Sequence, residues 1–528
     1  MKKYIVVTGG VLSGIGKGVS AAAIGKLLCS EYKIIPIKCD GYLNTDPGTM
    51  NPTEHGEVFV LEDGREVDMD FGHYERFLGI NCKANWNLTM GRVYEEIRKN
   101  ERRGKYLGKT VQLIPHVTNH IKEIIYSISK KEKSDITIIE IGGTVGDMEN
   151  MLFLTAVQQM KREVGKENMI YAHVTYVPTP FGVNEQKSKP TQQSVEKLLS
   201  MGINPDIIIA RCKKYLTNGV KKKISSFCNV EEDSILTGVD TKNIYEIPLI
   251  FERQGLTKVL SDKLRIPIEP SLDELKRLIY NMENTEKEVN IVICGKYSSL
   301  EDSYASIIEA LKHCSANLKI KINNEIIETT DLENKDLESI LKGKDGIIVP
   351  GGFGGRGIEG KISVIKYARE NNIPFLGLCL GLQAAVIEYI RNVCKIEDAN
   401  STEFDENTKN PVIVLMDKQK KIIKKGGTMR LGSCTAYLEE RSRIRKIYNK
   451  EIIRERHRHR YEVNPCYHEL LTKDGMALSG TSKDGKLVEF IELPKHKFFV
   501  ATQSHPEFKS RLEEPAPLFY HFIKACLK

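Results

Sequence analysis

The stretch Tyr4–Ser20, YIVVTGGVLSGIGKGVS, joins a short apolar run to a glycine-rich loop and then to a helix-like segment. A strand, a glycine loop and a helix in this order are typical of a phosphate-binding unit in a parallel sheet. The loop departs from the pattern G-x-x-x-x-G-K-[ST], because Gly18 follows Lys17 where a hydroxyl normally binds magnesium. We therefore expect a nucleotide site whose magnesium ligands lie elsewhere in the chain.

The same alternation of strand and helix continues along the chain. The apolar runs IIPIKCD, ITIIEIGG, MIYAHVTYVP and DIIIARC alternate with helical patterns. This rhythm predicts an α/β fold with mostly parallel sheets and helices on both faces. It pauses between Ile266 and Asn290 and restarts at VNIVICGKY. We expect a first domain over residues 1–266, a linker over 267–289 and a second domain over 290–528.

Composition narrows the possible classes of protein. A chain of 528 residues is longer than one compact domain usually is. Its content of 41% hydrophobic and 28% charged residues is typical of a globular protein. A net charge of +8 spread over this length, with a single tryptophan, gives little support for a nucleic-acid partner, and we expect none. No apolar run reaches the roughly 18 residues of a membrane span. The twelve cysteines lack C-x-x-C spacing, so we expect a cytoplasmic protein without a membrane partner.

The second half contains a candidate thiol nucleophile. Cys379 stands between glycines in GLCLG, after an apolar run and before a helical pattern, as in a nucleophile elbow. A buried structural cysteine is the alternative for this motif alone. The motif SHPEF adds His505 and Glu507, two residues apart, which suits a base and the group that orients it. The glycines of VPGGFGG can expose N–H groups for an oxyanion hole.

Together, PGGFG, GLCLGLQ and HPEF resemble the class I glutamine amidotransferase domain. The resemblance implies that Cys379 attacks the glutamine side-chain amide, that His505 is the general base and acid, and that Glu507 orients His505. Ammonia is the implied product. The N–H groups of Gly352 and Leu380 are implied to hold the oxyanion. The full implied set of glutamine-binding residues is Gly352, Leu380, Gly381, Leu382, Gln383, Glu403 and Arg460. The basic run RERHRHR could alternatively be a solvated or nucleic-acid-binding patch.

Polar stretches in the first half suggest an enzyme that consumes this ammonia. Ile37–Phe77 is long and poor in apolar residues, and such loops inside a domain are usually functional. Glu140 ends a predicted strand, where parallel sheets place their ligands. The cations of NEQKSKPTQQ precede a predicted helix, which suits a phosphate chain, although a solvated helix start is the alternative.

The ordered motifs TGGVLSGIGKG, DPGTMNP, HGEVFV, GHYERF, GGTVGD, KSKPTQ and FCNV, between Thr8 and Val230, resemble the CTP synthase family. The resemblance implies that ATP phosphorylates O4 of UTP and that ammonia displaces phosphate to give CTP, with Lys38 near the reacting phosphates and Asp70 and Glu140 on Mg2+. The implied ATP-binding residues are Gly14, Ile15, Gly16, Lys17, Gly18, Val19, Asp70, Val239, Asp240 and Thr241. The implied UTP- and CTP-binding residues are Ser13, Asp147, Met148, Glu149, Lys187, Ser188, Lys189, Pro190, Thr191, Gln192 and Lys223.

The same resemblance implies inhibition by CTP, activation by GTP, and a homotetramer that can stack into filaments. Arg356 and Arg430 are candidates for GTP binding. Two alternatives remain open at this point. One is an amidoligase of the same architecture with another substrate, such as a cobyrinate-type amidase, against which KSKPTQQ and DPGTM argue. The other is a polymer-forming scaffold whose sites have decayed.

Overall fold

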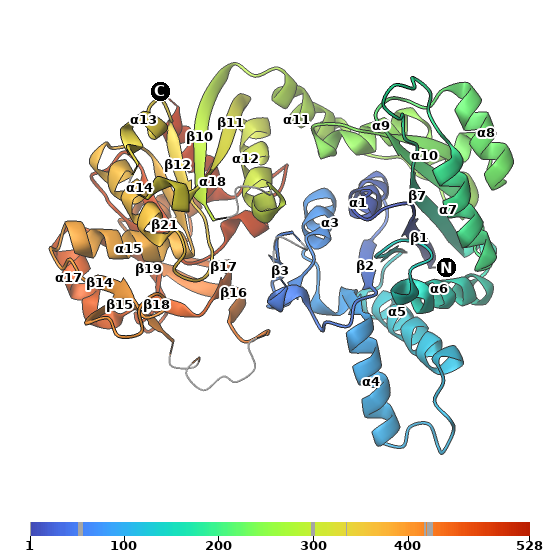
Figure 1. The fold of residues 1–528 in the computed structure, drawn as a ribbon, viewed down its shortest axis with the longest axis horizontal. Coiled ribbons are helices and arrows are strands. Elements are labelled where there is room, and N and C mark those ends of the chain that lie inside the picture. Colours follow the sequence, from blue (N-terminus) through green and yellow to red (C-terminus); the bar gives the residue numbers. More distant parts are fainter. Residues whose placement is uncertain are drawn as a thin grey trace. The chain divides into compact units, whose positions relative to one another are not determined.

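The computed structural model describes residues 2–50, 56–296, 301–333, 335–416, 419 and 426–527. The chain forms two compact units (Figure 1). Unit 1 comprises Met1–Thr45 and His73–Lys276, and unit 2 comprises Asp46–Gly72 and Arg277–Lys528. The domain ranges expected from the sequence stay a prediction. The units differ from those ranges in the segment Asp46–Gly72, which packs with the second half of the chain.

Unit 1 is built on a seven-stranded sheet in which every pairing is parallel. Its strands are rich in isoleucine and valine and almost wholly buried, as expected for strands covered on both faces. In spatial order they are β5 (Asn87–Thr89), β2 (Ile34–Asp40), β6 (Ile136–Ile141), β1 (Lys3–Gly9), β7 (Met169–Tyr176), β8 (Ile207–Cys212) and β9 (Ile235–Val239).

Helices cover both faces of this sheet. A connection between parallel strands is right-handed. The helix in such a connection therefore lies on one face of the sheet when the next strand is added on one side, and on the other face when it is added on the other side. Accordingly, α1 (Lys17–Leu28) packs against α9 (Ile247–Arg253), and α5 (Thr118–Glu132) packs against α6 (Met151–Val164). The remaining α-helices between His73 and Glu283 are α4 (Met90–Arg102), α7 (Lys189–Ser200), α8 (Asn218–Cys228), α10 (Leu256–Leu264) and α11 (Asp273–Glu283), and α3 (Asp70–Leu78) crosses the boundary between the units.

Unit 2 is built on a nine-stranded mixed sheet. The parallel part is β11 (Ile320–Glu328), β10 (Lys287–Gly295), β12 (Gly346–Val349), β13 (Phe375–Leu378) and β21 (Phe499–Thr502). The antiparallel part continues with β20 (Val488–Glu492), β19 (Ala477–Thr481), β16 (Arg430–Leu438) and β17 (Ile452–His459). The α/β class is confirmed, but this sheet is mixed rather than mostly parallel. A tight turn at Asp484-Gly485, with Gly485 at φ 70°, joins β19 to β20 and forces them antiparallel.

Each face of the unit 2 sheet carries its own hydrophobic core. Along β12, Ile347 and Val349 belong to the core under α14 (Ile358–Glu370) and α15 (Leu380–Asn392), while Ile348 belongs to the opposite core. That second core contains α12 (Ala305–Leu318) and α18 (Pro517–Cys526). Among the described residues, no helix is long and apolar enough to cross a membrane.

Smaller elements complete unit 2. They are a three-stranded sheet of β14 (Ala399–Ser401), β15 (Asn410–Leu415) and β18 (Tyr461–Val463), the strand pair β3 (Phe59–Val60) and β4 (Glu66–Val67), and the helices α13 (Leu337–Leu341), α16 (Arg443–Tyr448) and α17 (His468–Lys473).

Candidate functional site

Cys379 lies at a sharp turn between β13 and α15. Its φ of 52° is in the left-handed region, which a non-glycine residue rarely adopts and which is typical of a nucleophile elbow. The flanking glycines are required by close contacts. A Cβ at Gly381 would lie 2.1 Å from Val349 O, and one at Gly377 would lie 2.8 Å from Ala501 Cβ. The turn puts the sulfur at the N-terminus of α15, where the helix dipole favours a thiolate.

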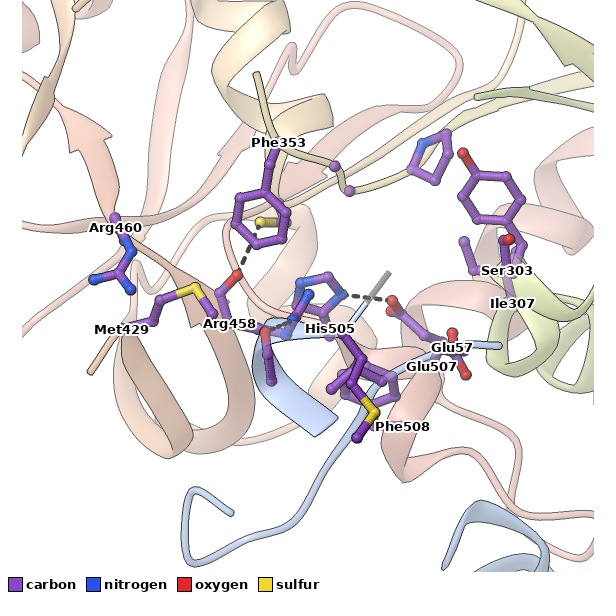
Figure 2. A pocket seen from close by; sticks show the side chains of 18 of the residues that line it. Glu57, Ser303, Ile307, Phe353, Met429, Arg458, Arg460, His505, Glu507 and Phe508 are labelled. Atoms are coloured by element: carbon purple, nitrogen blue, oxygen red, sulfur yellow. Dashed lines mark hydrogen bonds and ion pairs between the residues drawn. The ribbon is translucent and has the colours of Figure 1, made fainter. Parts of the chain in front are cut away.

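His505 and Glu507 follow β21, the strand next to β13. His505 Nδ1 lies 2.7 Å from Glu507 Oε1, a contact drawn in Figure 2. Burial lowers the pKa of His505, but the Glu507 carboxylate and the Cys379 thiolate outweigh it and raise that pKa to about 10. The imidazole is therefore held as a cation beside the sulfur, the arrangement that stabilises a thiolate.

The glycine loop between β12 and α14 faces this pair. A Cβ at Gly351 would lie 3.0 Å from His505 Cε1, which is tighter than an ordinary contact, and 3.5 Å from Cys379 Cβ, so glycine suits this close approach of the backbone. Leu380, Gly381 and Leu382 form the first turn of α15; the Leu382 N–H donates to Cys379 O at 3.0 Å, and Leu380 directly follows the nucleophile at the start of the helix. A Cβ at Gly352 would lie 3.5 Å from Leu380 Cδ2, so the two residues predicted for the oxyanion hole lie close to each other beside the thiol.

The other predicted glutamine-binding residues lie around the same centre. The Gln383 amide donates to Tyr461 O at 3.0 Å and to Gln503 Oε1 at 3.2 Å. Gln503, which was not predicted, donates its amide N–H to Cys379 Sγ at 3.6 Å. Glu403 accepts the Gly354 N–H at 2.6 Å, and Arg460 lines the cavity described next.

A cavity of about 410 Å³ connects Cys379 and His505 with residues from the early part of the sequence. Figure 2 shows Phe353, Met429, Arg458, Glu57 and Ser303 along its wall. The cavity is also lined by Gly48, Thr49, Met50 and Val58 of the Asp46–Gly72 segment. A segment that precedes Cys379 by more than 300 residues therefore forms part of the wall of the thiol site within unit 2.

Arginines of β17 hold that segment. Arg456 is fully buried, its Nε lies 3.1 Å from Glu62 Oε1, and its Nη1 donates to Val60 O at 3.1 Å. Arg458 pairs with Glu66 at 2.8 Å. Most of the basic run RERHRHR therefore lies in a largely buried strand rather than a solvated patch, although Arg454 is exposed.

In unit 1, the glycine loop after β1 adopts the conformation that the sequence predicts for a phosphate-binding loop. Gly14 and Gly16 have φ of 69° and 88°, and α1 begins at Lys17, so the N-terminus of the helix opens behind the loop. The Lys17 ammonium donates to Gly143 O at 2.9 Å, in the loop after β6. Gly18 is buried in the first turn of α1, and Ser13 is exposed on the loop.

Lys38 and Glu140 form a buried ion pair across two neighbouring strands. They are register partners on β2 and β6, and Lys38 Nζ lies 2.7 Å from Glu140 Oε1. The Tyr74 hydroxyl donates to the other Glu140 oxygen. Asp70 is the first residue of α3 and falls within unit 2. Its backbone N–H donates to Asp68 Oδ1 at 2.9 Å.

The other predicted nucleotide residues lie at the carboxyl-end loops of the unit 1 sheet. Asp147 accepts the Thr144 N–H at 2.7 Å, and Met148 is 83% exposed. Lys187 pairs with Glu185 at 2.5 Å, and the Gln192 amide donates to the Ser188 hydroxyl at 3.0 Å. The others are Ile15, Val19, Glu149, Lys189, Pro190 and Thr191 at the loops and helix starts, and Lys223, which is exposed on α8. Val239 ends β9, and Asp240 and Thr241 follow it; Asp240 pairs with Arg211.

A buried histidine beneath the glycine loop was not predicted. His173 on β7 is within hydrogen-bonding distance of Thr8 Oγ1 (2.9 Å) and Ser194 Oγ (2.8 Å). Burial, reinforced by the charge of Lys17, lowers the pKa of His173 to about 3, so the ring is neutral. It joins the end of β1 to α7, the two elements that carry the predicted ATP and UTP motifs.

Comparisons with known proteins agree with this geometry. A family model described as "CTP synthase N-terminus" matches residues 3–266, and one described as "Glutamine amidotransferase class-I" matches residues 299–525. The CTP synthase of Borreliella afzelii is 57% identical and that of Methanocaldococcus jannaschii 51% identical, each over at least 98% of both chains. A solved glutaminase domain of Trypanosoma brucei CTPS with bound acivicin is 40% identical and covers 45% of this chain and 93% of its own, with a TM-score of 0.43.

Both halves of the chain thus match the same two-part enzyme. The first family model covers the glycine loop and the Lys38–Glu140 pair, and the second covers Cys379, His505 and Glu507. Curated relatives extend the match over nearly the whole chain. The chain therefore belongs to the CTP synthase family of glutamine-dependent enzymes.

Proposed function

We propose that this enzyme converts UTP to CTP with ATP and with ammonia that Cys379 releases from glutamine. The observation that carries the proposal is the convergence of Cys379, His505 and Glu507 on a cavity whose wall includes the Asp46–Gly72 segment. That arrangement combines a glutaminase centre with a stretch from the half of the chain that resembles a nucleotide-dependent synthase.

The arrangement of Cys379, His505 and Glu507 supports the following glutaminase half-reaction. The Cys379 thiolate adds to the amide carbon of glutamine, and the N–H groups of Gly352 and Leu380 hold the resulting oxyanion. His505 gives its proton to the departing nitrogen, so that ammonia leaves and a γ-glutamyl thioester remains. His505, held by Glu507, then takes a proton from water, which attacks the thioester and releases glutamate. The side chains of Gln383, Glu403 and Arg460, with the backbone of Gly381 and Leu382, bind the amino acid.

The synthase half-reaction is assigned to unit 1. The loop Gly14–Val19 would hold the ATP phosphates on its N–H groups and Lys17, with Val239, Asp240 and Thr241 near the adenine. Ser13, Lys223 and the stretch Lys187–Gln192 would hold UTP. The γ-phosphate moves to O4 of the uracil ring, assisted by Lys38, and ammonia adds at C4 and expels phosphate, which gives CTP.

Magnesium is proposed at Asp70 and Glu140. Magnesium takes oxygen ligands and is usually bound by one or two carboxylates together with substrate phosphates. Glu140 fits, because its buried carboxylate ends a parallel strand beside Lys38. Among the described residues no group of three or more His, Cys, Asp or Glu side chains is placed to bind a metal. When bound, the ion would neutralise charge on the transferring phosphoryl group.

Regulation and assembly are also proposed. Asp147, Met148 and Glu149 are assigned to CTP inhibition and Arg356 to GTP activation. Arg430 is withdrawn as a GTP candidate, because its guanidinium is mostly buried and paired with Glu462 and Glu489. Exposed apolar side chains of unit 1, including Met148 and Phe181, support association into the expected tetramer and filaments. All twelve cysteines are free thiols, which supports a cytoplasmic location.

The test is direct. The protein is incubated with UTP, ATP, magnesium and glutamine, and CTP is measured by absorbance and chromatography. The proposal predicts CTP formation with either glutamine or ammonia as nitrogen donor. Failure with both donors would contradict it and would favour an amidoligase for another substrate.

A further inference from the structure

Two lysine side chains are buried beside the glycine loop of the thiol site. Lys361, on α14, is 0% exposed, and Lys296, which follows β10, is 2% exposed. Lysine is almost never fully buried unless its charge is compensated. Their position next to Pro350–Gly354 therefore calls for an explanation.

Both ammonium groups donate to carbonyls of the loop. Lys361 Nζ donates to Pro350 O at 3.0 Å. Lys296 Nζ donates to Phe353 O at 3.0 Å and also to Gly354 O. The two lysines thus bind the loop on either side of the Gly351–Gly352 peptide.

A bonded carbonyl fixes the direction of its whole peptide. In a planar trans peptide the C=O and the N–H point in opposite directions. The Phe353–Gly354 peptide shows this, because its carbonyl accepts from Lys296 and its N–H donates to Glu403 at 2.6 Å. A glycine-rich loop has little intrinsic preference among orientations, so these bonds select one.

The lysines and the catalytic pair lie against successive glycines. A Cβ at Gly352 would lie 3.9 Å from Lys361 Nζ and 3.8 Å from Lys296 Cδ, whereas one at Gly351 would face His505 and Cys379. The polypeptide between the lysines and the sulfur is therefore a single layer of backbone. Only this layer of backbone separates the two lysines from the thiol site.

Keeping these cations buried is energetically unfavourable. Burial lowers the pKa of Lys361 to about 7, with repulsion from Lys296 adding to it, and burial lowers the pKa of Lys296 to about 8. An apolar side chain of similar length would avoid that cost, and such replacements are often neutral or stabilising. The folded state alone thus gives no reason for lysine at either position.

We propose that Lys361 and Lys296 are positioning residues that fix the Pro350–Gly354 loop with the Gly352 N–H directed at the oxyanion formed on glutamine. The inference rests on the proposed roles of Cys379 and Gly352. Neither lysine touches the substrate. They act by holding the donor, so their loss weakens stabilisation of the tetrahedral intermediate and leaves the nucleophile intact.

The test compares Lys361→Met with Lys366→Met, an exposed lysine on the same helix. The full-length variants are assayed for glutamine hydrolysis, for inhibition by an aldehyde analogue of glutamine, and for alkylation of Cys379 by iodoacetamide. The aldehyde forms an oxyanion when the thiolate adds to it, whereas alkylation forms none. Lys361→Met is expected to lower kcat for hydrolysis and aldehyde affinity by about 10–100-fold. KM for glutamine, the alkylation rate and ammonia-driven CTP synthesis should match those of Lys366→Met.

Other outcomes overturn the inference. Full hydrolysis and full aldehyde affinity in Lys361→Met would show that the lysine does not position the loop. Parallel loss of alkylation and aldehyde binding would indicate general damage to the site and would also contradict it. Lys296→Met should show the same selective loss, and the melting temperature of Lys361→Met should not fall. Cys379→Ala in the same assays tests the proposed function separately, because hydrolysis that survives it would remove the nucleophile itself.

Discussion

The thiol site of unit 2 and the nucleotide loops of unit 1 differ in how far the protein alone assembles them. In unit 2, Cys379, His505, Glu507 and the glycine loop already converge on one cavity. In unit 1 the two lysines bond to other groups of the protein. Lys38 forms an ion pair with Glu140, and the Lys17 ammonium donates to the Gly143 carbonyl. Nucleotide phosphates would have to compete for these same cations.

This difference matches the two kinds of chemistry. Covalent catalysis needs a nucleophile, an acid and an oxyanion hole in fixed geometry, and all of them are protein groups. Phosphoryl transfer uses little covalent protein chemistry and depends on positioning highly charged substrates. The protein can therefore complete the first site by folding, whereas the second site is completed by its ligands.

The largest effect is expected from Cys379→Ala, which tests the unit 2 side of the comparison. Glutamine hydrolysis and glutamine-driven CTP synthesis should fall by about 10⁴-fold or more, because no other group can form the thioester. Ammonia-driven synthesis should persist, since unit 1 is untouched. Cys466→Ala, at an exposed cysteine, is the matched control. Equal loss with both nitrogen donors would contradict the division of labour.

Glu140→Gln tests the unit 1 side. The variant removes a negative charge beside Lys38 and should lower synthesis from both glutamine and ammonia by about 10²-fold or more. Glutamine hydrolysis should remain measurable. Glu123→Gln, at an exposed carboxylate of α5, is the control. Ammonia-driven synthesis at the unmodified rate in Glu140→Gln would show that this carboxylate has no part in phosphoryl transfer.

Glu507→Gln tests whether Glu507 controls the protonation of His505, the proposed general acid. Burial lowers the pKa of His505, but the Glu507 carboxylate and the Cys379 sulfur raise it to about 10, so the imidazolium form is present below that pH and is lost above it. Without the carboxylate the pKa of His505 should fall, and the alkaline limit of kcat/KM for hydrolysis should move to lower pH. The maximal rate should also fall, by about 10²-fold. An unchanged alkaline limit would mean that Glu507 does not control the imidazole.

The smallest effect is expected from Arg456→Met, which loosens the Asp46–Gly72 segment from β17. Removing one partner of a buried ion pair lowers the free energy of unfolding by about 3 kcal/mol. The loss expected for Arg456→Met is smaller, because the Glu62 side chain is partly exposed to solvent. Hydrolysis should change little, but the CTP formed per glutamate released should decrease. If that ratio stays constant while stability falls, the segment has a structural role only.

The sequence predicted the parts of this molecule that depend on local chemistry. Cys379, His505 and Glu507 each stand in a short motif whose geometry follows from a strand end, a turn and flanking glycines. The parallel strands of unit 1 follow from their apolar runs. Residues that act through distant contacts were missed. Arg456 contacts Glu62, which is 394 positions away in the sequence, and nothing local to either residue indicates this.

Buried lysines were missed for a different reason. Lys361 lies five residues after Arg356, a predicted site residue, but lysine is ordinarily exposed and nothing local to Lys361 indicates its burial. His173 and Gln503 likewise lie in a strand and at a strand end, in apolar sequence that predicts only a buried structural element. Only the packing of several elements around these side chains shows that they hold other groups in place.

The most direct test of the central claim is to identify the covalent intermediate. The enzyme is quenched in acid during turnover of glutamine, digested, and its peptides are mapped by mass spectrometry. The account predicts a γ-glutamyl group on the peptide containing Cys379, which is absent in Cys379→Ala and accumulates less in Lys361→Met. A glutamyl group on another cysteine, or hydrolysis that proceeds with Cys379 unmodified throughout, would contradict it.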